Sequence, residues 1–259
     1  RTMMNYIKSE FYRIFHSREI YRFIITLALL AFSFNAVLAW FRRMDDFPYG
    51  ITSHSYSNLV ASPLIFGLMG AIVGMILYEG NRRNGNLKNT VAFGISRTKI
   101  FISECIVTTI ISLISMVIIL AVYIGSAVML LEQAGPVELN DLLTEVPAVF
   151  LIAVACLISG IVCIEAFGKS STGIIIWTVI WFIFPKIFFY LGLRVDVLYD
   201  IAMWMPSNFF GMSGMTVNMS QCITAWETVG GMIKCLISGA VGTIVSLVAG
   251  ILLLRKREL

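Results

Sequence analysis

Six stretches of about twenty apolar residues constrain the fold of this chain more than any other feature. A helix needs about 20 apolar residues to cross the roughly 30 Å hydrocarbon core of a bilayer. Of the 259 residues, 58% are hydrophobic and 13% are charged, and the mean hydropathy is +0.87. We therefore expect an all-α integral membrane protein with one transmembrane domain over residues 1–259. The predicted spans are Tyr21–Trp40, Leu59–Tyr78, Ile100–Leu131, Val146–Phe167, Gly173–Leu191 and Met232–Leu254.

The distribution of basic residues predicts the orientation of these spans, because basic flanks are retained in the cytoplasm. Fourteen of the 19 Lys and Arg lie in residues 1–22 and 79–99, at Lys169 and in the tail 255–257, and three lie in the other loops. Both termini and residues 79–99 are thus predicted to be cytoplasmic, in the inner or plasma membrane of a bacterial cell. This topology accounts for the basic residues without nucleic acid. The acidic residues assigned to the outer loops are Asp45, Asp46, Glu132, Glu138, Asp141, Glu145, Asp196, Asp200 and Glu227.

Residues that could carry out catalysis are scarce. The two histidines, His16 and His54, are predicted on opposite sides of the membrane, so they cannot build a metal cluster or a histidine-based catalytic group. The phosphate-binding pattern G-x-x-x-x-G-K-[ST] is absent. The five cysteines suggest small apolar packing residues, with a Cys222–Cys235 bridge as the open alternative. We expect no enzyme activity, no metal and no cofactor in this chain.

Two features of the spans bear on their packing. The glycines at 67, 70 and 74, and those at 239 and 242, favour close helix–helix contact. Pro185 should kink or loosen the fifth span.

Charged residues within the spans, such as Glu165 and Lys186, lie near span ends, where they can reach water. An ion-coupled carrier is therefore disfavoured, and the energy for any transport should come from another subunit.

Two segments are predicted to be helical at the cytoplasmic surface. In residues 4–19 the apolar positions recur at helical spacing, which predicts an amphipathic helix lying on the inner membrane surface. In residues 79–99, Asn84–Gly85 favours a turn, 87–93 a short helix, Gly94 its end, and Ser96 the cap of the third span. An exposed loop has little reason to carry Leu87, Val91 and Phe93, so these side chains predict a partner surface.

Residues 192–231 form a long segment between the last two spans. Short helices around Pro206 are predicted to re-enter the outer leaflet, and the methionines offer a soft apolar surface for varied ligands or simply for packing. The methionines chosen as a candidate substrate-side surface are Met203, Met205, Met212 and Met215. Few polar groups line the spans, which favours an amphipathic peptide, antibiotic or lipid-like substrate over a sugar or a small ion.

Together these features resemble the membrane (permease) subunits of type-2 ATP-binding-cassette exporters. The resemblance rests on the amphipathic first helix, the six spans, the loop with Glu79-Gly80, Gly85-Asn86-Leu87-Lys88-Asn89 and Gly94-Ile95-Ser96-Arg97, and the basic tail. It implies that the loop after span 2 carries a coupling helix that enters a groove of the ATPase. The residues assigned to coupling are Glu79, Arg82, Arg83, Gly85, Leu87, Lys88, Val91, Phe93 and Arg97.

The resemblance also implies the assembly. Two permease subunits, identical or related, would pair near spans 1 and 5, with Trp177 and Trp181 chosen as seam residues, in contact with membrane lipids. Two ATPase subunits would bind ATP and Mg²⁺. The alternative that the residues leave open is a membrane scaffold or assembly factor with no transport cycle.

Overall fold

The chain folds into a bundle of long helices. The computed structural model describes residues 2–44, 47–83, 94–218 and 221–258. Five helical stretches are long and apolar enough to cross a membrane: α2 (Arg18–Phe41), α6 (Arg97–Leu130), α7 (Leu139–Phe167), Ser170–Gly192, and α12 up to Leu254. A bent helix pair raises the number to six when it is counted as one span. The prediction of a helical, multi-pass membrane protein is confirmed at this level.

The bent pair corrects the predicted second span. Residues 59–78 do not form one continuous helix; instead α3 (Thr52–Val60) and α4 (Leu64–Arg83) meet at 66°. Pro63 lies at the break. Proline has no backbone N–H and disfavours helical geometry in the residue before it, so a helix cannot run through Ser62 into α4 without losing bonds. The long helix of this pair therefore starts after Pro63, and α4 continues past Tyr78 to Arg83.

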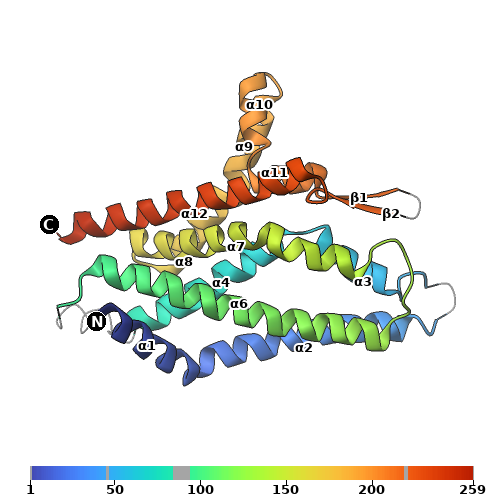
Figure 1. Ribbon diagram of the computed structural model, residues 1–259, viewed down its shortest axis with the longest axis horizontal. Coiled ribbons are helices and arrows are strands. Elements are labelled where there is room, and N and C mark those ends of the chain that lie inside the picture. The colour runs from blue at the N-terminus through green and yellow to red at the C-terminus, as the bar shows by residue number, and fades with distance from the viewer. Residues whose placement is uncertain (1, 45–46, 84–93, 219–220, 259) are drawn as a thin grey trace.

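Helix α7 is the centre of the bundle, with α4 and α12 (Val229–Glu258) packed along it (Figure 1). Both neighbours approach through glycine. A Cβ added at Gly70 would lie 3.2 Å from the Ala153 carbonyl oxygen, and one at Gly239 would lie 2.7 Å from the Ile152 nitrogen. Because glycine has no Cβ, the helix backbones can approach each other at these positions more closely than a larger side chain would allow. The predicted packing role of these glycines is confirmed.

The start of α7 differs from the expected start at Val146. The helix begins at Leu139, where the Glu138 amide donates to the Asp141 carboxylate at 2.8 Å in a capping box. Glu145, assigned from the sequence to an outer loop, therefore lies inside the helix and is fully buried. Within the part of the chain that the structure describes, neither of its carboxylate oxygens has a hydrogen-bond partner.

A buried polar network joins α2, α3 and α6. The Asn35 amide donates to the Tyr123 carbonyl oxygen at 2.9 Å and to Ser126 Oγ at 2.8 Å. The Ser55 hydroxyl donates to Asn35 Oδ1 at 2.7 Å, and the Tyr123 hydroxyl donates to the Ser55 carbonyl oxygen at 2.6 Å. The members of this network thus satisfy one another's hydrogen-bonding groups in an apolar environment, which fixes the packing of α2 on α6.

We expect Asn35→Leu to lower the free energy of unfolding by about 1–3 kcal/mol. Interhelical hydrogen bonds in membranes average ~0.6 kcal/mol and reach about 1.7, and three are lost here. Ser33→Leu on the exposed side of the same helix is the matched control and should change little. Unfolding of the purified chain in detergent measures both variants, and an equal effect would contradict a role for the network.

The fifth span is loosened next to Pro185, which was one of the two effects predicted for this proline. It consists of α8 (Ser170–Thr178), a π-helical turn η1 (Val179–Ile183) and α9 (Phe184–Gly192). Pro185 cannot donate to the carbonyl four residues earlier and its ring crowds that carbonyl. The turn before it is π-helical, and the Phe184 N–H donates to the Val179 carbonyl oxygen five residues earlier. α9 and the next helix, α10 (Asp196–Ala202), project from the side of the bundle (Figure 1).

The segment after α10 contains helix α11 (Pro206–Ser213) and a β-hairpin that the sequence reasoning missed. Strands β1 (Met215–Asn218) and β2 (Gln221–Thr224) pair antiparallel, with Met215 opposite Thr224. Cys222 in β2 is a free thiol, as are the other four cysteines. Burial, with the carboxylates of Asp141 and Glu227, raises the pKa of the Cys222 thiol to about 11, so it is protonated and unreactive at neutral pH.

Candidate functional site

The candidate site lies at the end of the bundle that carries both chain termini (Figure 1). We call this the basal end. It is formed by α1 (Thr2–Phe15), the last turns of α4, the first turns of α6 and the ends of α7 and α12. The predicted coupling block, residues 79–99, joins α4 to α6 here. Its two ends are therefore anchored in helices that pack on the same central core.

The structure describes the two ends of the coupling block. Glu79 is exposed on α4, and Arg82 and Arg83 lie in the last turn of that helix. On the other side Gly94 has a φ of +81°, a left-handed conformation that suits a glycine, and Ser96 is the N-cap of α6 before exposed Arg97. Gly85, Leu87, Lys88, Val91 and Phe93 lie outside the described residues.

Helix α1 docks on α4 and α6 beside the block. Ile14 is 2% exposed and belongs to a cluster with Leu77 of α4 and Val107 of α6, against which Ile7 and Phe11 pack in part. Met4 and Phe15, two further apolar residues of α1, are exposed. The packed face is centred on Tyr6, Glu10 and Ile14, one turn apart along the helix.

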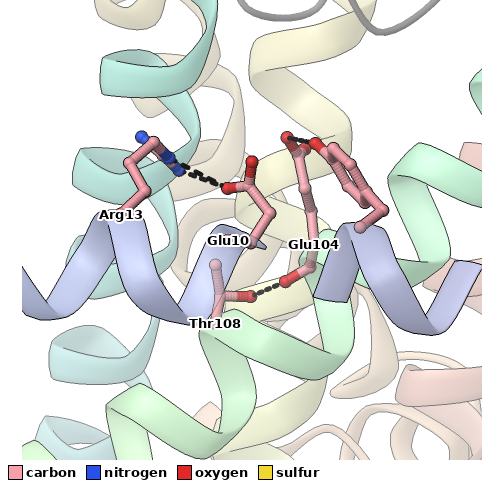
Figure 2. A network of polar contacts seen from close by, with 5 residues as sticks. Glu10, Arg13, Glu104 and Thr108 are labelled. Carbon is pink, nitrogen blue, oxygen red and sulfur yellow. Dashed lines mark hydrogen bonds and ion pairs between the residues drawn. The ribbon is translucent and has the colours of Figure 1, made fainter. Parts of the chain in front are cut away.

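Two buried carboxylates, Glu10 of α1 and Glu104 of α6, lie side by side where these helices pack (Figure 2). The Arg13 guanidinium donates to Glu10 at 3.0 Å and 2.5 Å. The Tyr6 hydroxyl donates to Glu104 Oε1 at 3.5 Å, and the Thr108 hydroxyl to the Glu104 carbonyl oxygen at 2.6 Å. Glu10, Glu104 and Thr108 border a small cavity of about 10 Å³ that Leu77 and Tyr78 of α4 complete. The Tyr6–Glu104 hydrogen bond therefore joins α1 to α6, whereas the Glu10–Arg13 ion pair lies within α1.

A further polar contact ties α4 to α7 at the same end. Tyr78 precedes Glu79 on α4, and Glu165 lies near the last turn of α7. The Tyr78 hydroxyl donates to the Glu165 carboxylate. Helix α7 then ends at Gly168, which has a φ of +74°. The helices that flank residues 84–93 are thus linked to α1 and α7 by buried contacts.

The sequence reasoning missed Glu10 and Glu104, although a signal was present. Glu104 is a carboxylate inside the predicted span Ile100–Leu131, and an ionisable residue in a span is a functional candidate by default. Glu10 follows Tyr6 and precedes Ile14 at four-residue spacing, which places it on their face of the helix. Glu104 could have been identified from its place inside a span, and Glu10 from its spacing.

The other predicted site residues do not gather at the basal end. Trp177 is 2% exposed, and its indole N–H donates to the Cys156 carbonyl oxygen at 3.0 Å. The Trp181 indole donates to Ser159 Oγ at 2.8 Å. Both rings therefore turn toward α7 of their own chain. Met203, Met205, Met212 and Met215 lie in or beside α10, α11 and β1, and Met212 is the most exposed of the four.

We expect Ile14→Asp to release α1 while the spans stay folded. A charge at this buried position has no described partner, and burying it costs several kcal/mol more than undocking a short surface helix. Phe15→Asp, at the exposed neighbouring position, is the control. Protease cleavage of α1 in vesicles should accelerate only for Ile14→Asp. Equal cleavage of both variants would show that α1 is not held by this face.

The fold and its basal end define a multi-pass membrane protein with a connecting block held between two packed helices. The sequence model described as ABC-2 family transporter protein matches residues 6–186, which cover α1 to the start of α9. The chain belongs to this family of membrane components of ATP-binding-cassette transporters. No curated protein and no solved structure matches the chain.

Proposed function

We propose that the chain is the permease subunit of an ATP-binding-cassette exporter, driven by a separate ATPase subunit. The observation that carries this proposal is the family match, together with the anchoring of the coupling block between α4 and α6 beside α1. In this account the ATPase holds ATP and Mg²⁺, and the permease forms the translocation path. No nucleotide site is proposed in the chain itself, whose sequence lacks the pattern G-x-x-x-x-G-K-[ST].

Coupling would operate through the block after α4. Leu87, Val91 and Phe93 would fill a groove of the ATPase, and Arg82, Arg83 and Lys88 would orient the block electrostatically. Movement of the ATPase would then be passed to α4 and α6, and from them to α7 through Tyr78 and Glu165. The hydrogen bond from Tyr6 to Glu104 would keep α1 moving together with α6.

The working unit would contain two permease and two ATPase subunits. Support comes from the fifth span, whose second half, α9, projects from the side of the bundle (Figure 1) and whose exposed apolar side chains extend along both halves of the span. The residues of this exposed stripe are Ile175, Val179, Ile180, Ile183, Ile187 and Tyr190. Because Trp177 and Trp181 face α7, this stripe replaces them as the proposed seam.

Cysteine cross-linking tests the proposed seam. Cysteines at Ile175 and Ile183 should join two copies of the chain in native-like lipid, because both positions lie on the exposed stripe. A cysteine at Val245, which is equally exposed on α12, controls for random collisions. A monomer, or cross-linking of all three positions at one rate, would overturn the seam.

The proposed substrate is an amphipathic peptide, antibiotic or lipid-like molecule, moved outward. Apolar lining of the spans supports this class, and Met212 and the other methionines beside α10 and α11 would offer adaptable contacts.

Both termini would lie in the cytoplasm, since the basal end carries most of the basic residues. A reporter that is active only outside the cell, fused to Leu259, should therefore be silent.

Recovery of the partner tests the proposed function as a whole. The full chain, tagged and purified from its native membrane in mild detergent, should bring with it an ATPase that carries a nucleotide-binding motif, in equal amount. Recovery without any ATPase, with other membrane proteins instead, would support a scaffold or assembly factor.

A further inference from the structure

A long apolar cavity lies inside the bundle, between α2, α4, α6 and α7. Its volume is about 320 Å³. On α6 its lining runs from Thr109 to Tyr123, which corresponds to about 21 Å of helix. This length is about two-thirds of the ~30 Å hydrocarbon core that the helices cross. The cavity is therefore a slot parallel to the spans rather than a rounded pocket.

The slot offers few polar groups to an occupant, because the hydroxyl-bearing residues in its lining are limited to Thr109, Ser112, Ser115 and Tyr123. Among its lining residues, the hydroxyl of Thr109 donates to the Cys105 carbonyl oxygen at 2.7 Å and that of Ser115 to the Ile111 carbonyl oxygen at 2.8 Å. The Tyr123 hydroxyl donates to the Ser55 carbonyl oxygen at 2.6 Å. A buried water needs two to four polar partners, so water would not fill this space.

The slot is also too large to stay empty in a packed bundle. Protein interiors hold few voids larger than a water molecule, and an apolar cavity of about half this volume already binds apolar molecules such as benzene. Helix α2 packs on α6 but makes little contact with α4, so the slot is continuous with the outer surface of α2. Leu30, which lines the slot, is 60% exposed on that surface.

We propose that this slot binds one acyl chain of a membrane phospholipid. In a multi-pass membrane protein the exposed surface of α2 faces lipid. Phospholipid acyl chains therefore surround the opening of the slot beside α2. A flexible chain matches the slot in length, in narrowness and in the lack of polar groups. The bound acyl chain acts as a spacer that sets the distance of α2, and of the attached α1, from α4 and α7.

A photoactivatable phospholipid tests the site without the ATPase or a transport substrate. The full chain is reconstituted into vesicles of phosphatidylcholine that contain a phosphatidylcholine with a diazirine in mid-chain, and the labelled peptides are mapped after illumination. Met69 and Met116, which line the slot on α4 and α6, should be labelled. Labelling confined to outward residues such as Leu29 would overturn the proposal.

Two variants make the test specific. Ala31→Phe with Ser112→Phe places two rings in the slot, and labelling of Met69 and Met116 should then be lost. Leu29→Phe with Val117→Phe adds the same rings on the outward faces of the same helices and should leave that labelling unchanged. Undiminished labelling in the slot-filling variant would contradict the site.

Native mass spectrometry of the unmodified chain gives an independent readout that needs no variant. One bound phosphatidylcholine per chain should survive transfer from detergent, because the acyl chain is held between four helices. A chain that carries no lipid would show that α2 closes over the slot and would overturn the proposal. This outcome is independent of the proposed coupling to an ATPase, so the two proposals can fail separately.

Discussion

Replacing Leu87 and Val91 together by Asp is expected to release the ATPase from the permease or to uncouple ATP hydrolysis from transport, while the spans remain folded. Truncating a buried interface anchor typically costs about 2 kcal/mol or more, which is roughly 30-fold in affinity. Two anchors are lost here, and each is replaced by a charge that must be desolvated. The readouts are recovery of the ATPase and its activity in the lipid-reconstituted complex.

The matched control neutralises charge in the same block. Arg82 and Arg83 changed to Gln should cost much less, since an exposed ion pair contributes roughly 0–1 kcal/mol. These substitutions also weaken the basic bias of the loop, so the topology of the variant is checked with the Leu259 reporter. Unchanged recovery and activity in the double Asp variant would mean that the block is a solvated loop.

Gly239→Ala and Gly125→Ala are expected to change stability in opposite directions. A Cβ at Gly239 would lie 2.6 Å from Leu151 Cβ and 2.7 Å from the Ile152 backbone nitrogen, so α12 has to move away from α7. Overpacking of this kind costs about 1–3 kcal/mol or more. At Gly125 of α6 nothing lies within 4 Å, and alanine favours a helix by up to ~1 kcal/mol over glycine.

The two glycine variants are compared by thermal unfolding in the same detergent and by the yield of folded protein. The larger effect is expected for Gly239→Ala, because the neighbouring atoms belong to the backbone of the central helix and cannot rotate away. Gly239→Val should be worse still. Equal stability of Gly239→Ala and the unmodified chain would contradict the close contact of α12 with α7.

Local patterns in the sequence were sufficient to predict most of the helices. Span lengths follow from apolar runs, the widened turn before Pro185 follows from its missing N–H, and the cap at Ser96 follows from its preference for that position. The glycine contacts were predicted because small residues at regular spacing have few other uses inside a span. All of these features depend on residues close together in the chain.

Features that depend on distant residues were not predictable in the same way. Hydropathy alone extended the second span back to Leu59 and passed over the break at Pro63, because both sides of the break are apolar. The burial of Trp177 depends on its bond to Cys156 of α7, which no local pattern reports. The β-hairpin at 215–224 was missed because its short strands lie in a segment interpreted as helical.

Photo-cross-linking from the coupling block tests the central claim most directly. A photoreactive amino acid is placed at Val91 in the full chain, and the complex is illuminated in its native membrane. The account predicts a covalent product of the permease with its ATPase, and none from Thr216 in the hairpin at the opposite end of the bundle. No product from Val91, or equal products from both positions, would contradict coupling through this block.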